Sequence, residues 1–143
     1  MTKLNLKEEI FEVIKEPHLT NLATITEDGK PWNRYVIAVG SDDLTIRFST
    51  ILNLRKVNHI KKNPEVHLNC GISGMEEMKP YLQIQGKAEI TTDQHERNNF
   101  WNEGLKAYFS GPEDPNYLIV IVKPYLIEYN KPADMGPPQI WTA

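Results

Sequence analysis

Arg55 and Lys56 are adjacent cations at the expected start of a helix. Thr50 and Asn53 both match the residue types preferred at a helix N-cap, and the sequence does not choose between them. With Asn53 as the cap, both cations fall in the first turn, where aligned dipoles and unpaired N–H groups already concentrate positive charge. A helix start with two cations beside it suits a bound anion, and a phosphate in particular. The alternative is an ordinary solvated helix face.

The helix is predicted from the spacing of Leu54, Val57 and Ile60, and Asn63-Pro64 ends it. Arg34 supplies a third candidate cation from a strand expected at 32–39. It shares a strand face with Val36 there, and an arginine seldom lies unpaired among apolar neighbours. Arg34 therefore either lies on a solvated face or contributes to the same anion site.

Bulk properties exclude several classes of function. The 143 residues fit one domain, and the net charge of −3 argues against nonspecific binding to nucleic acid. The single cysteine, Cys70, allows no internal disulfide and no thiolate metal cluster, and we expect it to be a small core residue in a cytoplasmic protein. The four histidines lack metal-ligand spacing. No apolar run approaches the roughly 20 residues of a membrane helix.

The elements around these cations read as mainly β. Alternating apolar residues predict strands near 19–26, 32–39, 44–49, 66–72, 81–90 and 117–122, and a further edge or outer strand at 125–129 after an interruption at Pro124. Helices are expected near 5–15 and after Thr92 or Asp93, and a loop is expected at 71–79. Gly86 predicts a bulge or a close approach by another backbone. An antiparallel barrel of six or seven strands with flanking helices accounts for this pattern.

The C-terminal residues 130–143 are too proline-rich for regular structure to be expected. Trp141 should nevertheless dock against this chain or a partner chain, because a tryptophan is costly to leave in water. A barrel this small fills its interior with side chains. A cofactor would then lie outside the barrel or in a crevice shared with a second subunit.

With these elements and cations, the chain resembles the pyridoxamine 5′-phosphate oxidase-like split-barrel flavoproteins, and within them the general stress protein 26-like branch. The resemblance covers roughly Glu9 to Tyr129 and rests on the order and spacing of several segments. These are Leu22-Ala23-Thr24-Ile25, Asp28-Gly29-Lys30-Pro31, Arg34-Tyr35-Val36, Phe48-Ser49-Thr50, Leu54-Arg55-Lys56, Asn63-Pro64 and Ile84-Gln85-Gly86-Lys87-Ala88-Glu89.

The resemblance implies a single split-barrel domain over 1–143 that forms a homodimer, with flavin mononucleotide (FMN) in each of two clefts at the subunit interface. It implies that Arg55 and Lys56 grip the FMN phosphate and that Arg34 reaches the phosphate and ribityl chain. The positions implied along the ribityl chain and ring are Tyr35, Val36, Ser49 and Thr50. From the partner subunit, Tyr81 or Gln83 would approach the isoalloxazine, and Trp141, Trp101 or the tail would close the cleft.

Two departures narrow the expected function. The true oxidase has a substrate-contacting lysine five residues after the strand arginine, where this chain has Val39, and its C-terminal Arg-x-His arm has no counterpart in 137–143. Pyridoxamine phosphate oxidation is therefore not expected. We expect an FMN-dependent oxidoreductase with a small-molecule substrate, reduced by NADH or NADPH and related to stress, and the sequence assigns no catalytic residue. The alternatives are a flavin-binding module without turnover, a barrel that binds deazaflavin or haem, and a barrel without a cofactor.

Overall fold

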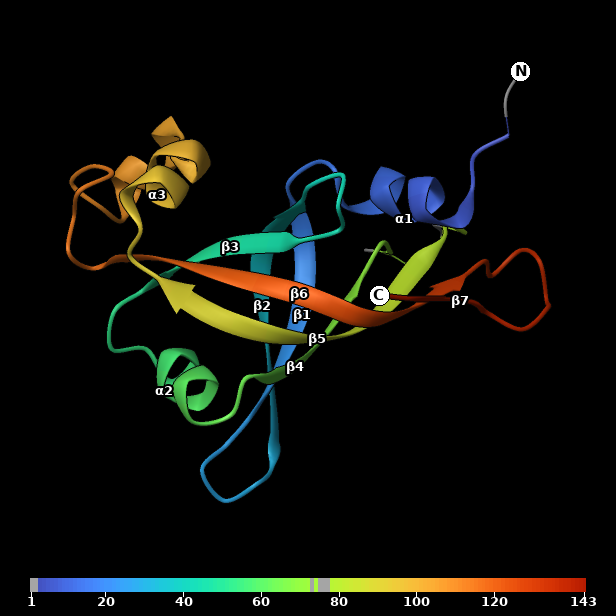
Figure 1. Ribbon diagram of the computed structural model, residues 1–143, viewed down its shortest axis with the longest axis horizontal. Helices are drawn as coiled ribbons and strands as arrows, with labels where there is room; N and C mark the ends of the chain where they lie inside the picture. Colours follow the sequence, from blue (N-terminus) through green and yellow to red (C-terminus); the bar gives the residue numbers. More distant parts are fainter. Residues whose placement is uncertain (1–2, 73, 75–77) are drawn as a thin grey trace.

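Antiparallel strands wrap into a barrel in this computed structural model, which describes residues 3–72, 74 and 78–143 (Figure 1). The strand order is β3-β2-β1-β4-β5-β6-β7, and a further pairing of β3 with β6 closes the first six strands. The described strands are β1 (His18–Ile25), β2 (Pro31–Gly40), β3 (Ile46–Ile51), β4 (Glu65–Cys70), β5 (Tyr81–Thr91), β6 (Tyr117–Asn130) and β7 (Gln139–Thr142). This confirms the predicted mainly-β barrel.

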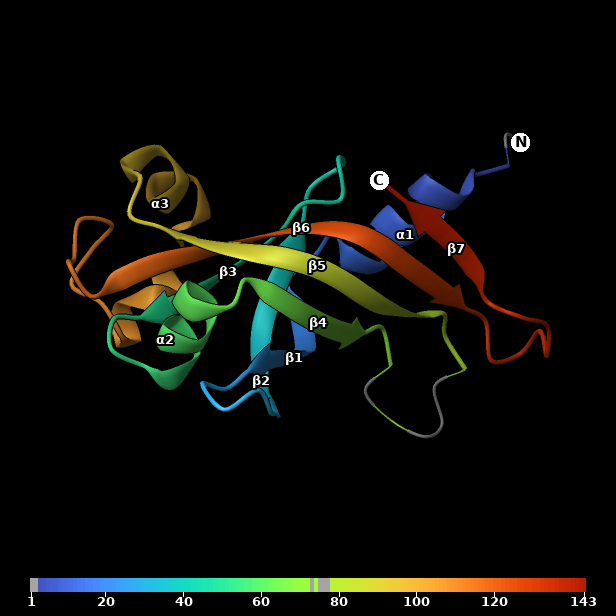
Figure 2. The same cartoon turned by 60° about the horizontal axis from the view of Figure 1, so that its bottom comes forward.

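The helices of the described residues are α1 (Leu6–Ile14), α2 (Arg55–Lys62), α3 (Gln94–Phe100) and the 3₁₀ helix η1 (Glu103–Ala107). Figures 1 and 2 show α1 and α2 on opposite sides of the barrel strands. In the parts of the chain that the structure describes, no helix combines the length and apolar character needed to cross a bilayer.

Inward-facing side chains fill the barrel, as the strand alternation predicts. Leu22, Phe48 and Leu68 are fully buried, and α1 adds Ile10 and Ile14 to the same core cluster. α1 lies within the helix predicted near 5–15, and a capping box starts it: the Asn5 side chain accepts from the Glu8 N–H, and the Asn5 N–H donates to the Glu8 side chain.

The predicted interruption at Pro124 is wrong, since β6 runs without a break from Tyr117 to Asn130. The ladder between β5 and β6 shifts register between Gln85 and Gly86, where Pro124 lies opposite Gly86. A Cβ on Gly86 would lie 2.9 Å from Val122 Cγ1 and 3.0 Å from the Lys123 carbonyl oxygen. β6 carries the extra residue of this bulge, Tyr125, and the proline can remain within the strand because its missing donor falls at an irregularity in the ladder.

The end of β6 is also not an edge. Residues 126–129 pair with β5 on one side and with β7 on the other. β7 itself contradicts the expected irregular tail, since Gln139–Thr142 form a strand in which Trp141 lies opposite Ile127. Trp141 is half-buried and packs against the main core, so its docking on this chain is confirmed. Of the loop predicted at 71–79, residues 73 and 75–77 lie outside the described residues.

The packing of Trp141 predicts a measurable loss of stability on truncation. We expect Trp141→Ala to lower the free energy of unfolding by about 2–3 kcal/mol, somewhat less than for a fully buried tryptophan. Ile140→Ala is the matched control, because Ile140 neighbours Trp141 on β7 but is 55% exposed. Urea unfolding followed by circular dichroism measures both, and equal losses would show that Trp141 is not anchored as described.

Candidate anion and cofactor site

α2 begins at Arg55, with Leu54 as its N-cap residue and no side-chain hydrogen bond closing the first turn. Both predicted caps are therefore wrong. Thr50 still belongs to β3, and Asn53 adopts a left-handed backbone with φ of 77°, which asparagine tolerates and which turns the chain before the helix. The first-turn position expected with Asn53 as the cap nevertheless holds, since Arg55 and Lys56 are the first two helical residues.

Arg34, Arg55 and Lys56 form what we call the cation cluster, at the N-terminal end of α2. Arg34 Nη1 donates to Thr24 Oγ1 at 2.7 Å and to the Leu22 carbonyl oxygen at 3.3 Å. Lys56 Nζ donates to Thr50 Oγ1 at 3.3 Å. The Arg55 guanidinium lies 4.9 Å from the centre of the Trp32 ring, a cation–π contact. The cluster thus joins β2, the end of β3 and the start of α2.

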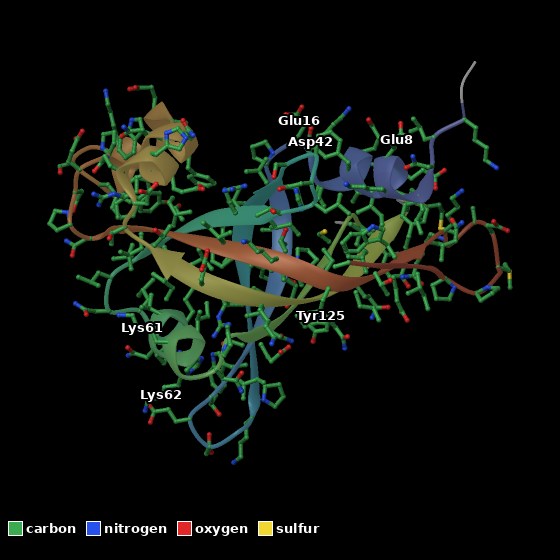
Figure 3. All side chains as sticks on the ribbon, viewed as in Figure 1. Glu8, Glu16, Asp42, Lys61, Lys62 and Tyr125 are labelled. Carbon is green, nitrogen blue, oxygen red and sulfur yellow. The ribbon has the colours of Figure 1, made fainter. Side chains whose placement is uncertain are left out.

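The electrostatics of the cluster favour an anion. Burial lowers the pKa of Arg34, and the neighbouring Arg55 lowers it further. Burial followed by the charge of Arg34 likewise lowers the pKa of Lys56. No ion pair recorded for the described residues joins a cluster member to a carboxylate, whereas Lys62, labelled on α2 in Figure 3, pairs with Glu27 at 2.8 Å. The cluster therefore holds concentrated positive charge that a phosphate would neutralise.

The two ends of α2 differ in how their charges match the helix dipole. Lys61 and Lys62 lie in the last turn, where cations stabilise a helix. Arg55 and Lys56 lie in the first turn, where cations oppose the dipole, and no acidic residue accompanies them there. Local helix stability does not account for this second pair, which is consistent with a role in binding.

β2 and β3 separate next to the cation cluster. They pair only at Val39 with Arg47 and at Gly40 with Ile46. Residues 31–38 of β2 pair with β1 on one side, and residues 48–51 of β3 pair with β6 on one side. On the sides where β2 and β3 face each other, these residues have no ladder partner in the described chain. A cavity of about 300 Å³ opens beside the separated strands, with Ile37, Ala38 and Val39 of β2, Ser49 of β3, and Asn99 and Phe100 of α3 in its lining.

The structure brings together four of the residues predicted for the site: Arg34, Thr50, Arg55 and Lys56. Ser49 lines the adjacent cavity. The Val36 side chain is buried in the barrel core, so only its backbone could contact a ligand. Tyr35 lies on the outer face of β2, with 68% of its surface exposed.

Three other predicted site residues, Tyr81, Gln83 and Trp141, lie elsewhere in this chain. Tyr81 and Gln83 are on β5, which β1 and β4 separate from β2. Trp141 is on β7, away from α2 in Figures 1 and 2. Their predicted roles therefore require a second copy of the chain and stay predictions. Trp101 packs edge-on against the Tyr117 ring in a second core cluster, at 5.4 Å between centroids.

Sequence reasoning missed three residues of the site: Trp32, Thr24 and His59. His59 is buried and its Nδ1 lies 2.9 Å from Thr24 Oγ1. The spacing of four between Arg55 and His59 places both on one helix face, and this was the available signal. Thr24 gives no signal in the sequence beyond its place on the inward face of β1.

Two other chemistries find little support in the described residues. No group of three or more His, Cys, Asp or Glu side chains there is arranged to hold a metal ion. Burial raises the pKa of the Cys70 thiol to about 12, so it is a protonated core residue rather than a nucleophile.

Comparison with known proteins places the chain in a family. A family model described as pyridoxamine 5′-phosphate oxidase matches residues 6–131. The chain belongs to this family. It is 30% identical over 124 residues to general stress protein 26 of Bacillus subtilis (strain 168), covering 87% of each chain. The crystal structure of general stress protein 26 from Bacillus anthracis str. Sterne superposes with a TM-score of 0.83 at 29% identity, covering 98% of this chain and 100% of that one.

More distant structures share the fold alone. A pyridoxamine 5′-phosphate oxidase-related, FMN-binding protein from Nostoc punctiforme has a TM-score of 0.61 at 17% identity, covering 86% of this chain and 78% of that one. A haem-binding protein from Mycobacterium smegmatis has a TM-score of 0.77 at 14% identity, covering 99% of this chain and 60% of that one. An F420 reductase has a TM-score of 0.64 at 22% identity, covering 81% and 93%.

The site predicts how stability depends on pH. Burial first, and then the charges of Arg34 and Arg55, lower the pKa of His59 below the ordinary value of 6.5. Between 6.5 and the folded value, the unfolded chain therefore binds more protons than the folded one. We expect the protein without cofactor to lose stability as the pH falls through this window, and His59→Gln to lose less. Melting temperatures measured from pH 7.5 to 5.0 check this; parallel curves for the two proteins would contradict it.

Proposed function

We propose that this protein is a flavoprotein that binds FMN, with the phosphate held by Arg34, Arg55 and Lys56. The observation that carries the proposal is the concentration of three cations, without a recorded carboxylate partner in the described chain, at a helix start without a side-chain cap. The paired N–H donors of an arginine guanidinium and the ammonium group of a lysine both suit a phosphate dianion. Membership of the family and the FMN-binding Nostoc punctiforme protein support FMN as the ligand.

The separated strands fit the rest of such a ligand. From Arg34 to Ala38 is four residues along β2, about 13 Å at strand spacing. The cation cluster would hold the phosphate at one end, and the cavity beside Ala38 and Ser49 would receive the ring at the other. The unpaired edges of β2 and β3 offer backbone N–H and C=O groups to the ligand between them.

We further propose that the active form is a homodimer. Leu19, Tyr35 and Ile37 expose 52%, 68% and 57% of their surfaces on the outer face of β1 and β2, and Leu19 lies opposite Ile37 in the ladder. Exposed apolar side chains grouped in this way favour a protein interface. A second copy would cover them and would bring its own Tyr81 or Gln83, and its Trp141, toward the flavin cleft.

The reaction we propose is electron transfer by an oxidoreductase in the cytoplasm. Bound FMN supplies hydride and single-electron chemistry, so the chain needs no general acid or base of its own. The residues of the chain bind the phosphate, orient the ring and limit the access of water. NADH or NADPH would reduce the flavin and a small-molecule acceptor would reoxidise it. Val39 and a tail built into β7 favour an activity other than pyridoxamine phosphate oxidation, and the resemblance to general stress protein 26 favours a role in stress.

Spectroscopy of charge variants tests the cofactor. We expect the wild type to bind FMN and Arg55→Ala/Lys56→Ala to bind at least about 100-fold more weakly, because two charge-assisted contacts are lost. Lys61→Ala/Lys62→Ala is the matched control, since it removes the same charge from the other end of the same helix. Flavin fluorescence during titration measures all three affinities.

The outcomes separate the alternatives. Equal affinities for the two double variants would contradict the phosphate site. A wild type that takes up haem or a deazaflavin but no FMN would contradict the cofactor. Oxidation of NADH or NADPH by the FMN-loaded wild type, followed with a panel of acceptors, distinguishes an enzyme from a flavin-binding module.

The dimer is tested by charge at the exposed patch. We expect Ile37→Lys to be monomeric in light scattering after size exclusion, because a buried lysine would oppose association. Tyr108→Lys is the control, as Tyr108 is 71% exposed and follows η1 rather than lying on β1 or β2. A monomeric wild type, or an unchanged dimer of the Ile37 variant, would contradict the proposed interface.

A further inference from the structure

Arg34 is held by a chain of hydrogen bonds that starts at a part-buried contact with Thr24 and ends at a buried contact between Thr24 and His59. Arg34 Nη1 donates to Thr24 Oγ1 at 2.7 Å, and Thr24 Oγ1 lies 2.9 Å from His59 Nδ1. Thr24 has 1% of its surface exposed and His59 has 8%. The contact is built by the strand register, because Thr24 lies diagonal to Arg34 across the ladder between β1 and β2.

The direction of these bonds follows from the donors available. A guanidinium only donates, so Thr24 accepts from Arg34 and its own hydroxyl hydrogen remains to be placed. His59 is the other side-chain partner recorded for that hydroxyl within the described chain. The lowered pKa of His59 is consistent with a neutral imidazole, which accepts at Nδ1 in the tautomer that carries its hydrogen on Nε2. We assign this tautomer, in which the hydrogen bonds run from Arg34 to Thr24 to His59.

These hydrogen bonds occupy Nη1 of Arg34 and leave its Nε and Nη2 donors for a ligand. Nη1 has two hydrogens, and its two recorded acceptors are Thr24 Oγ1 and the Leu22 carbonyl oxygen. The donors on Nε and Nη2 make no recorded bond within the described chain, and these two nitrogens form the edge that binds phosphate oxygens in pairs. Fixing Nη1 therefore fixes the plane and direction of the remaining edge.

We propose that Thr24 and His59 are positioning residues that orient the guanidinium of Arg34 for a phosphate group. The inference rests on the proposed function for the identity of the ligand, but its geometry concerns Arg34 alone. The charged groups that act on His59 are Arg34 from β2, Arg55 from its own helix and Glu27 from the turn between β1 and β2. Thr24 lies between the imidazole and the guanidinium, so the orientation is transmitted through its hydroxyl.

A double-mutant cycle with FMN titration tests this role. Thr24→Val keeps the branched shape and removes the hydroxyl, and we expect it to weaken FMN binding about tenfold. Thr24→Ser restores the hydroxyl and should bind within about twofold of the wild type. In an Arg34→Ala background, Thr24→Val should cause no further loss. An equal loss in both backgrounds would mean that Thr24 acts only through stability, and an unchanged affinity of Thr24→Val would also overturn the proposal.

The histidine is tested by restoring its acceptor. His59→Leu removes the acceptor for the Thr24 hydroxyl and should weaken FMN binding about threefold, whereas His59→Gln offers an amide oxygen and should restore most of the affinity. Equal affinities of the two variants would remove His59 from the chain of contacts. Melting temperatures of all variants without ligand identify any that fail to fold, in which case Thr24→Ser and His59→Gln carry the comparison with the wild type.

Inorganic phosphate separates this inference from the proposed cofactor. Phosphate should raise the melting temperature of the wild type more than that of Thr24→Val at the same concentration. If this holds while FMN fails to bind the wild type, the proposed function is wrong and the positioning role stands. If FMN binds the wild type but the cycle is additive, the positioning role is wrong and the proposed function stands.

Discussion

Mutual repulsion among Arg34, Arg55 and Lys56 is the constraint on which the site depends. Burial and the neighbouring charges lower the pKa of Arg34 and of Lys56, so both side chains are less favourably charged in the fold than in water. Packing in the barrel core must therefore hold β2 and α2 in place against the repulsion between the cations that they carry. Locally unfavourable charge of this kind is common at binding sites. A bound phosphate would offset the repulsion among the three cations.

The topology explains how distant residues meet. α2 follows β3 after a short turn, so the helix begins close to the end of β3. Asn53 lies in this turn and has a left-handed backbone conformation. β3 pairs with β6 along its length but with β2 at two positions only. The barrel is thus closed through β6 while β2 and β3 separate, and the separation leaves backbone edges beside the cations. The same strand arrangement provides the charge for a phosphate and the opening for the rest of a ligand.

The sequence predicted the helix better than the contacts around it. The spacing of Leu54, Val57 and Ile60 predicted a helix here, which the structure confirms, because amphipathic spacing is a local property. The first-turn position of Arg55 and Lys56 was predicted only with Asn53 as the cap, and the structure places them there with Leu54 as the cap. The caps were wrong because a positive φ at Asn53 is set by the turn as a whole. β7 was missed because the pairing of Trp141 with Ile127 is tertiary and overrides the low strand preference of a proline-rich tail. The contact of Thr24 with His59 joins residues 35 apart in sequence, and no local pattern predicts it.

The charge on the phosphate of bound FMN tests the central claim most directly. Phosphorus NMR of the FMN-loaded protein across pH 5 to 8 follows the second ionisation of that phosphate, whose ordinary pKa is about 6. Three nearby cations favour the dianion, so the bound phosphate should stay dianionic well below pH 6, with a resonance distinct from that of free FMN. A bound phosphate that titrates as it does in free FMN would show that the cation cluster does not hold it.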